Sequence, residues 1–153
     1  MRIAIDASVL VALLNPHDLW RTQAMALMDA LLSAKLTPVY LDCAVAEAVS
    51  ASARWLHEKR RESKVRDLVS SLDTQVPRDM LTWILPDVPR LYSQVLELVR
   101  SSAGELNFND ALIALACRER DILAIASFDA DFDRIAWLRR LVVPQDIIDM
   151  VSN

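Results

Sequence analysis

The chain opens on a short apolar run that ends at a carboxylate: Arg2-Ile3-Ala4-Ile5-Asp6-Ala7-Ser8-Val9-Leu10. Ile3 and Ile5 fit a buried strand, and residues 9–14 fit a helix packed against it. Asp6 then lies at the strand-to-helix junction, which in an open α/β sheet is the edge that binds ligands. Two interpretations stay open: Asp6 is part of a site, or Asp6 or Ser8 only caps the helix.

Size and composition predict one folded domain over residues 1–153. The chain has 153 residues, of which 54% are hydrophobic, enough to bury a sizeable core. Its net charge of −4 disfavours a protein that holds nucleic acid by bulk positive charge. A local basic patch or a bound divalent cation can reverse that sign within a site. The charge therefore weakens nucleic-acid hypotheses without excluding them.

The sequence shows no pattern typical of a signal peptide, a membrane span, a cysteine metal site or a glycine-rich phosphate loop. Asp6 interrupts the N-terminal apolar run and no cleavage site follows, so a signal peptide is not predicted. No apolar run approaches the roughly 18 residues of a membrane span. Cys43 and Cys117 show no metal-ligand spacing, which favours buried thiols in a reducing cytoplasm. The single glycine, Gly104, leaves no room for a glycine-rich phosphate loop.

Strands and helices are predicted to alternate, which is typical of an α/β fold with a parallel sheet. The expected strands are residues 3–5, 39–41, 81–85 at a sheet edge, 122–126 and 141–143. The expected helices are residues 9–14, 19–34, a long helix capped by Asp42, 88–99, 106–116 and a short C-terminal helix.

Four acids are placed to meet at one edge of this sheet. Asp6 and Asp129 follow strands directly, while Glu47 and Asp110 lie one or two turns into helices. Right-handed crossovers bring these positions to the same edge. Four converging carboxylates repel one another unless a cation neutralises them. Hard ions such as Mg²⁺ or Mn²⁺ accept an all-oxygen site of this kind.

Most of these acids can also be explained without a bound ion, by a role in local structure or by simple exposure to solvent. Glu47 has no basic neighbour on its helix and fits a solitary exposed glutamate. Asn107 and Asp110 have the spacing of a capping box. The acidic run after Asp129 is not a calcium loop, because Arg134 and Arg140 occupy the positions of its glycine and its bidentate glutamate.

One stretch is locally basic. Between residues 54 and 66, only Glu58 and Glu62 oppose six cations: Arg54, Lys59, Arg60, Arg61, Lys64 and Arg66. Such a run either contacts a phosphate backbone or forms a solvated helix face, and the second interpretation is favoured.

The chain resembles the PIN-domain ribonucleases, most closely the VapC-type toxins of toxin–antitoxin pairs. The resemblance covers essentially the whole chain and rests on four matches in order: Ile5-Asp6-Ala7-Ser8, Ala46-Glu47-Ala48, Leu106-Asn107-Phe108-Asn109-Asp110-Ala111 and Ser127-Phe128-Asp129-Ala130-Asp131-Phe132. It implies a three-layer α/β/α fold with a central, mostly parallel sheet of about five strands. It also implies metal-dependent hydrolysis of RNA phosphodiester bonds.

The resemblance implies a role for eight residues. Asp6, Glu47, Asp110 and Asp129 would be catalytic and would bind one or two Mg²⁺ or Mn²⁺ ions. The residues expected to contact substrate or to support these acids are Ser8, Ser127, Asn109 and Asp131. Asp129 is preferred to Asp131 because it follows Ser127 at the family spacing. The family more usually has threonine at position 127, and the basic region 54–66 is extended relative to a compact member.

The implied partners are an RNA substrate, a small antitoxin that blocks the site, and a second copy of the chain in a homodimer. Two alternatives remain open. A haloacid-dehalogenase-like phosphatase would need an aspartate where this chain has Ser8. A non-catalytic PIN-like interaction domain would keep the fold, but the retention of all four acids counts against it. His17 and His57 lack a nucleophile–base setting, which argues against a serine or cysteine hydrolase.

Overall fold

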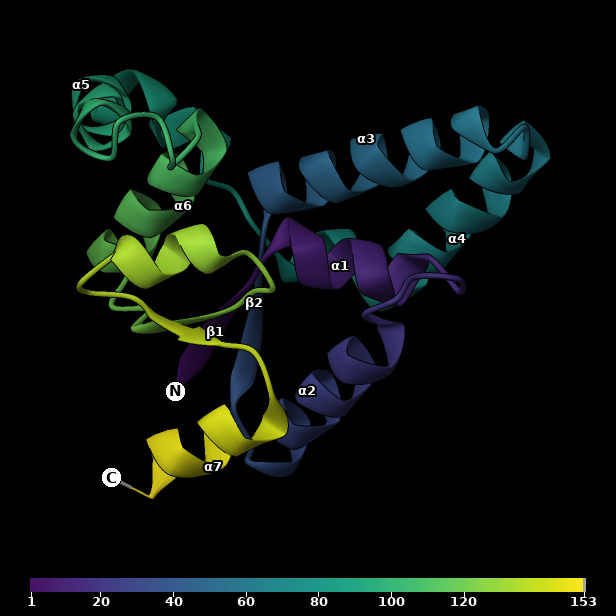
Figure 1. Cartoon of the computed structure of the whole chain (residues 1–153), viewed down its shortest axis with the longest axis horizontal. Coiled ribbons are helices and arrows are strands. Elements are labelled where there is room, and N and C mark those ends of the chain that lie inside the picture. The colour runs from purple at the N-terminus through teal and green to yellow at the C-terminus, as the bar shows by residue number, and fades with distance from the viewer. Residues whose placement is uncertain (153) are drawn as a thin grey trace.

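The computed structural model describes residues 1–152 and contains the predicted central sheet (Figure 1). All strand pairings are parallel, in the order β3-β2-β1-β4-β5. The strands are β1 (Arg2–Ile5), β2 (Thr37–Leu41), β3 (Leu81–Thr82), β4 (Ala124–Ala126) and β5 (Arg139–Leu141). The five predicted strands are therefore confirmed in number, and the third lies at an edge as expected.

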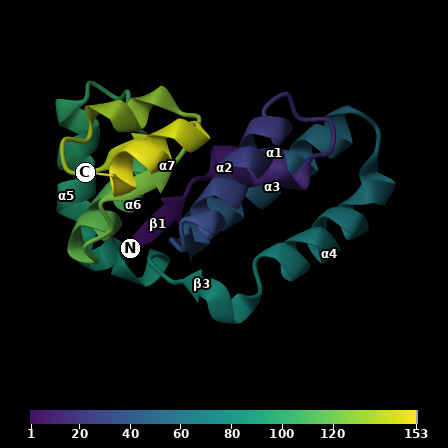
Figure 2. The same cartoon turned by 90° about the horizontal axis from the view of Figure 1, so that it is seen from below.

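Helices cover both faces of the sheet, giving three layers. They are α1 (Ala7–Leu14), α2 (Arg21–Ser33), α3 (Asp42–Glu58), α4 (Val65–Gln75), α5 (Val88–Ser101), α6 (Phe108–Glu119) and α7 (Pro144–Val151). Figures 1 and 2 show α5 and α6 on one side of β1, and α1 to α4 on the other. The predicted α/β/α class is confirmed. In residues 1–152, no helix is both long and apolar enough to cross a membrane.

The central strands are buried on both faces, as parallel strands between two helical layers must be. Ile3, Ala4 and Ile5 of β1 are completely buried, and so is all of β4. In α6, every residue from Asp110 to Cys117 is buried. This burial explains why that helix is apolar on all sides after its first turn.

Two strands end earlier than predicted, and acidic side chains explain both ends. The strands β1, β2 and β4 differ from the prediction only in where they start, at Arg2, Thr37 and Ala124. The third strand stops at Thr82 because Ile84 N and Leu85 N donate to the Asp42 carboxylate, at 2.9 and 3.1 Å, instead of extending the ladder. The last strand covers residues 139–141 rather than 141–143. Val142 N and Val143 N donate to Asp146 Oδ2 at 2.7 and 2.9 Å, which ends the sheet there.

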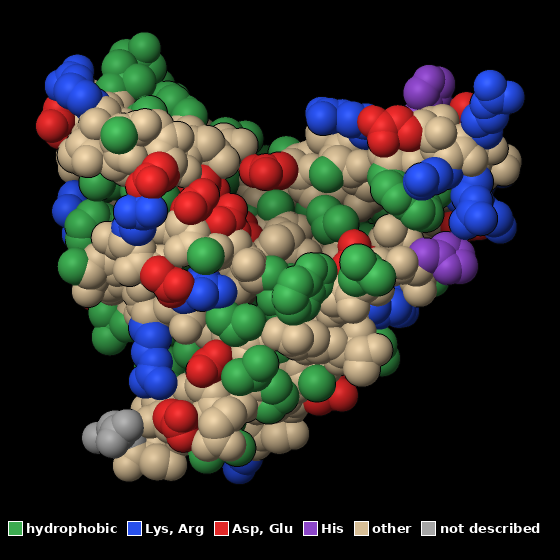
Figure 3. All heavy atoms as spheres, in the orientation of Figure 1, with side chains coloured by type: hydrophobic (Ala, Val, Ile, Leu, Met, Phe, Trp, Pro, Cys, Tyr) green, Lys and Arg blue, Asp and Glu red, His purple; other side chains and the backbone are tan. Residues whose placement is uncertain are grey.

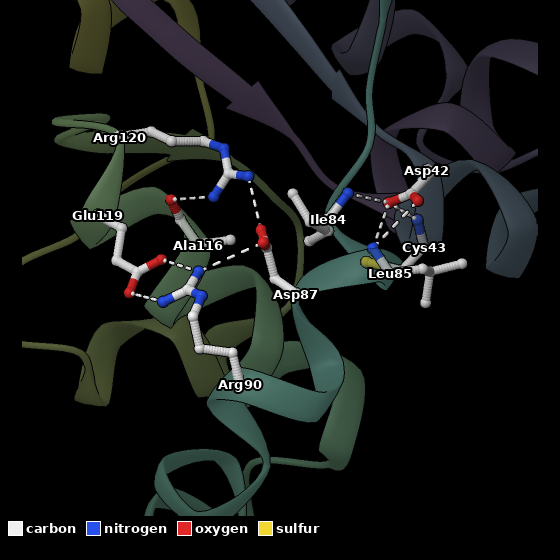
Figure 4. A network of polar contacts seen from close by, with 9 residues as sticks. All are labelled: Asp42, Cys43, Ile84, Leu85, Asp87, Arg90, Ala116, Glu119 and Arg120. Carbon is white, nitrogen blue, oxygen red and sulfur yellow. Dashed lines mark hydrogen bonds and ion pairs between the residues drawn. The ribbon is translucent and has the colours of Figure 1, made fainter.

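Asp42 is not the N-cap that the sequence predicted. It is the first residue of α3, and Leu41 occupies the N-cap position. Figure 4 shows its buried carboxylate holding the segment around Ile84 and Leu85 against the start of α3. Asp42 thus fixes the direction in which α3 leaves the sheet.

No helix was predicted directly after α3. The structure contains one there, α4, and it forms a helical hairpin with α3. A short 3₁₀ turn, Glu62–Lys64, leads from α3 into α4, which packs back along α3. In Figure 1 these two helices form an arm that extends away from the sheet. The basic residues between positions 54 and 66 lie at the tip of this arm and are exposed.

Candidate active site

The candidate site lies at the carboxyl ends of β1 and β4. Asp6 follows β1 directly, and its backbone N–H continues the ladder to Ala126 O of β4 at 3.0 Å. A pocket of about 400 Å³ is lined by Asp6, Glu47, Asp110 and Asp129 among other residues. Figure 3 shows acidic side chains gathered in the notch between α6 and the start of α3. The structure therefore brings together the four predicted acids.

Asp6 satisfies both interpretations of its role. It is the N-cap of α1, and Oδ2 accepts from Ser8 N at 3.3 Å. The same oxygen accepts from Ser8 Oγ at 2.6 Å and from Ser127 Oγ at 2.7 Å. All of these bonds end on Oδ2, which fixes the orientation of the carboxylate and leaves Oδ1 for a ligand.

The two serines act as a link between Asp6 and the loop after β4. Ser8 Oγ accepts from Phe128 N, and Ser127 Oγ accepts from Asp129 N, each at 3.0 Å. Because each hydroxyl accepts from a backbone N–H, its own proton is free to point at Asp6. Ser127 is completely buried, whereas Ser8 is half-buried and lines the pocket. The hydroxyl is the only side-chain group of Ser127 that takes part in these bonds.

Asp110 also has two roles in the structure. The predicted capping box is confirmed: Asp110 N donates to Asn107 Oδ1 at 3.0 Å, and Asn107 N donates to Asp110 Oδ2 at 3.2 Å. Burial raises the pKa of Asp110 to about 7, and the charges of Asp6, Asp129 and Glu47 add to the increase. The capping bond opposes that increase and does not overcome it.

Glu47 and Asp129 complete the pocket from two further elements. Glu47 is exposed on α3, and Asn109 Nδ2 of α6 donates to its Oε2 at 3.2 Å. Asp129 is half-buried and caps a short 3₁₀ turn, Ala130–Arg134, by accepting from Asp131 N at 2.9 Å. Asp129 lines the pocket and Asp131 lies behind it as the donor of that bond.

Sequence reasoning missed an aromatic wall beside the acids. Trp20 and Phe128 stack with ring centroids 5.1 Å apart, and both line the pocket. Trp20 is 50% exposed although its ring is apolar. Asp18 lines the same pocket. No sequence signal pointed to this stack, because Trp20 falls in the helix predicted over residues 19–34 and the contact joins residues more than one hundred positions apart.

The carboxylates as they stand do not form a closed metal shell. Among residues 1–152, no group of three or more His, Cys, Asp or Glu side chains is arranged to hold a metal ion. The donor set nevertheless fits a hard divalent cation, because four carboxylates share one pocket. Burial raises the pKa of Asp110, and the charges of the other three acids add to that increase. Asp133, the ion-pair partner of Arg140 at 2.6 Å, is the main cause of the raised pKa of Arg140, and Asp129 contributes less.

Comparison with known proteins identifies the family. The PIN domain model matches residues 3–138. No curated protein matches significantly. Among solved structures, the chain is similar to the crystal structure of Mycobacterium tuberculosis VapC20, described as a Sarcin-Ricin loop cleaving toxin. The TM-score is 0.66 at 22% identity, over 88% of this chain and 95% of that one, which establishes a shared fold. The family match spans most of the sequence, and the chain belongs to the PIN domain family.

Proposed function

We propose that this protein is a divalent-metal-dependent endoribonuclease and the toxin of a toxin–antitoxin pair. One observation carries the proposal: four carboxylates from four separate elements share a pocket, and none of the ion pairs within residues 1–152 involves them. Membership of the PIN domain family and the shared fold with an RNA-cleaving toxin support the substrate class.

The roles of the acids follow from their environments. Asp6, Glu47, Asp110 and Asp129 would hold one or two Mg²⁺ or Mn²⁺ ions. A bound ion of this kind activates water and stabilises charge on the phosphate. Asp6 is oriented by Ser8 and Ser127, so its free oxygen keeps one direction. Asp110, whose pKa burial raises to about 7, would release its proton in order to hold such an ion.

The remaining predicted residues position this cluster. Asn109 holds Glu47 against α6. The backbone N–H of Asp131 donates to Asp129 Oδ1 and so orients the Asp129 carboxylate. The stacked rings of Trp20 and Phe128 provide a flat apolar wall next to the acids, and an unpaired base stacks well on such a surface.

The partners of this function are an RNA, a small antitoxin and a second copy of the chain. An antitoxin that places a basic side chain on the unpaired acids would both neutralise them and close the pocket. We expect a homodimer at micromolar concentrations. Light scattering tests this state directly, and a monomer across that range would remove the dimer from the proposal.

The deciding experiment is cleavage of a structured and a single-stranded RNA with Mg²⁺, with Mn²⁺ and in excess chelator. Cleavage is expected only with metal, since the acidic pocket alone repels the phosphate backbone. Hydrolysis of a phosphomonoester without RNA cleavage would indicate a phosphatase instead. Inactivity on both substrates, with antitoxin binding retained, would indicate a non-catalytic PIN-like domain. Undiminished cleavage in chelator would rule out the metal mechanism.

A further inference from the structure

A second pocket, of about 500 Å³, lies between α3 and α4 of the arm and reaches the basic residues at its tip. It is enclosed by α3, α4 and the segment that follows α1. The lining combines apolar, aromatic and basic side chains, among them Leu56, Leu68, Trp55, Arg60, Arg61 and Lys64. We call it the arm pocket. It is separate from the pocket of the four acids, with which it shares no lining residue.

A buried hydroxyl of this pocket lacks a hydrogen-bond partner. Ser52 is 4% exposed and lines the arm pocket, and its Oγ bonds to nothing among residues 1–152. Ser50, on the same helix, shows the usual arrangement, because its Oγ donates to Ala46 O at 2.8 Å. Buried polar groups are rarely left unpaired. The free hydroxyl therefore marks a position where a polar atom of a bound group fits.

The charge at this pocket is opposite to that of the whole chain. The net charge is −4, yet three of the six cations between residues 54 and 66 line the arm pocket. Lys64 pairs with Asp67 at 3.1 Å, whereas Arg60 and Arg61 are exposed and take part in no ion pair of residues 1–152. Figure 3 shows Lys and Arg side chains collected at the tip of the arm, opposite the acidic notch.

The two pockets lie along one helix. Glu47 lines the acidic pocket and Trp55 lines the arm pocket, and both belong to α3. Eight residues of helix span about 12 Å, so a short length of nucleic acid chain can reach both.

We propose that the arm pocket binds one unpaired nucleotide of the RNA substrate. The base lies against Trp55 with a polar edge toward Ser52, and an adjacent phosphate lies on Arg60 and Arg61. This inference rests on the proposed function, because it takes RNA to be what reaches the acidic pocket. Aromatic stacking combined with basic side chains is how proteins hold single-stranded RNA. The arm pocket thus attracts the substrate that the acidic pocket repels.

The test compares two double variants that remove the same charge from the same basic stretch. Arg60→Gln with Arg61→Gln changes the arm pocket, while Arg54→Gln with Arg66→Gln changes exposed positions outside its lining. Affinity is measured by fluorescence anisotropy with a labelled single-stranded RNA of about 12 nucleotides, in chelator so that the RNA stays intact. We expect the pocket pair to weaken binding at least about tenfold more than the control pair.

Single variants separate the base from the phosphate. Trp55→Leu keeps an apolar side chain and should weaken RNA binding about tenfold, the effect of losing one stacked base. Ser52→Ala should weaken binding severalfold without lowering the melting temperature, since its hydroxyl has no partner in the free protein. Ser50→Ala on the same helix is the matched control and should leave RNA affinity unchanged.

Three outcomes would overturn the inference: equal weakening by both double variants, unchanged RNA affinity in Trp55→Leu, or loss of antitoxin binding alone in the pocket variants. The first indicates diffuse electrostatics, and the last indicates a protein-binding groove. Cleavage with Mg²⁺ is scored separately. If RNA is cut but the pocket variants bind it normally, only this inference fails. If RNA binds in the arm pocket but is never cut, only the proposed nuclease function fails.

Discussion

Two groups of acids in this molecule have opposite surroundings. In the first, Asp87 and Glu119 meet Arg90 and Arg120 where α5 begins and α6 ends (Figure 4). Arg120 Nη2 lies 2.6 Å from Asp87 Oδ2, and Arg90 donates to both Glu119 oxygens at 2.6 and 2.7 Å. These arginines lower the pKa of Asp87 and of Glu119. Every acid here already has its cation.

In the second group, the neighbours of the four acids of the candidate site are hydroxyl groups, amide groups and other carboxylates. Burial and neighbouring charges raise the pKa of Asp110 to about 7. The same residue type is thus stabilised as an anion at one end of α6 and destabilised as an anion at the other. The difference indicates that the arginine-paired group holds helices together, while the four acids of the candidate site take part in no ion pair among residues 1–152.

The largest expected difference between the groups is in catalysis. Asp6→Asn and Asp110→Asn should each lower kcat/KM for RNA cleavage by about 10²–10⁴-fold, since each removes a charge needed at the reacting phosphate. Asp87→Asn should leave cleavage near the wild-type value. Initial rates at saturating Mg²⁺ measure all three. Comparable losses in the three variants would show that the site residues act through folding alone.

Variants in the two groups of acids should also differ in how much Mg²⁺ stabilises the folded protein. A ligand at one hundred times its dissociation constant stabilises by about 2.7 kcal/mol, which is a shift of several degrees at this size. The wild type and Asp87→Asn should gain this shift from Mg²⁺, whereas Asp6→Asn and Asp110→Asn should gain much less. Asparagine at position 6 still caps α1, and Asn107 remains the N-cap of α6 in Asp110→Asn, so capping itself does not produce a difference between chelator and Mg²⁺. Parallel melting curves for all four proteins, in chelator and in Mg²⁺, would contradict a shared metal site.

Much of this comparison could be predicted from the sequence, because its parts are local. The acids at strand ends and the capping box of Asn107 and Asp110 follow from spacing within a few residues. The parallel sheet follows from alternating apolar runs. What could not be predicted depends on contacts between distant residues. Asp42 and Asp146 end strands by taking N–H groups from the ladder, and no periodicity reveals that competition.

The site shows the same division. The convergence of Asp6, Glu47, Asp110 and Asp129 was predicted from crossover geometry. The stack of Trp20 on Phe128 and the two hydroxyl bonds to one oxygen of Asp6 depend on side-chain placement after folding. The arm pocket likewise requires the α3–α4 hairpin, and no second helix of that hairpin was predicted.

The pH dependence of stability should have opposite signs in the two groups. The pKa of Asp110 in the folded protein is about 7, above its ordinary value of 3.8. The contribution of Asp110 to the free energy of unfolding is therefore complete below pH 4, and it is lost as the pH rises toward 7. The slope stays below about 1.4 kcal/mol per pH unit, because water reaches part of the site. The lowered pKa of Asp87 stabilises the fold above its unfolded pKa, and this contribution is lost as pH falls through the acid range.

Urea unfolding in chelator, from pH 4 to pH 8, measures both signs. Asp110→Asn should remove the decline between pH 4 and pH 7, and it should be at least as stable as the wild type at pH 8. Asp87→Asn should keep that decline. A wild-type stability that rises steadily through this range would show that the Asp110 carboxyl is ionised without penalty.

The smallest expected effect comes from breaking the arginine-paired group itself. Arg120→Gln removes the ion pair with Asp87 and leaves that acid in partial contact with water, since its side chain is 23% exposed. Ion pairs of this kind contribute about 1 kcal/mol or less, which corresponds to roughly 2–4 °C at this size. Arg90 also lies 3.3 Å from Asp87 and limits the loss. The expected result is a slightly lower melting temperature with an unchanged Mg²⁺-induced shift and unchanged RNA cleavage, because no residue of this group lines the acidic pocket. Scanning calorimetry with and without Mg²⁺, next to a cleavage assay, measures all three quantities. A lost Mg²⁺ shift in Arg120→Gln would mean that the two groups of acids are coupled through α6, and the comparison between them would no longer hold.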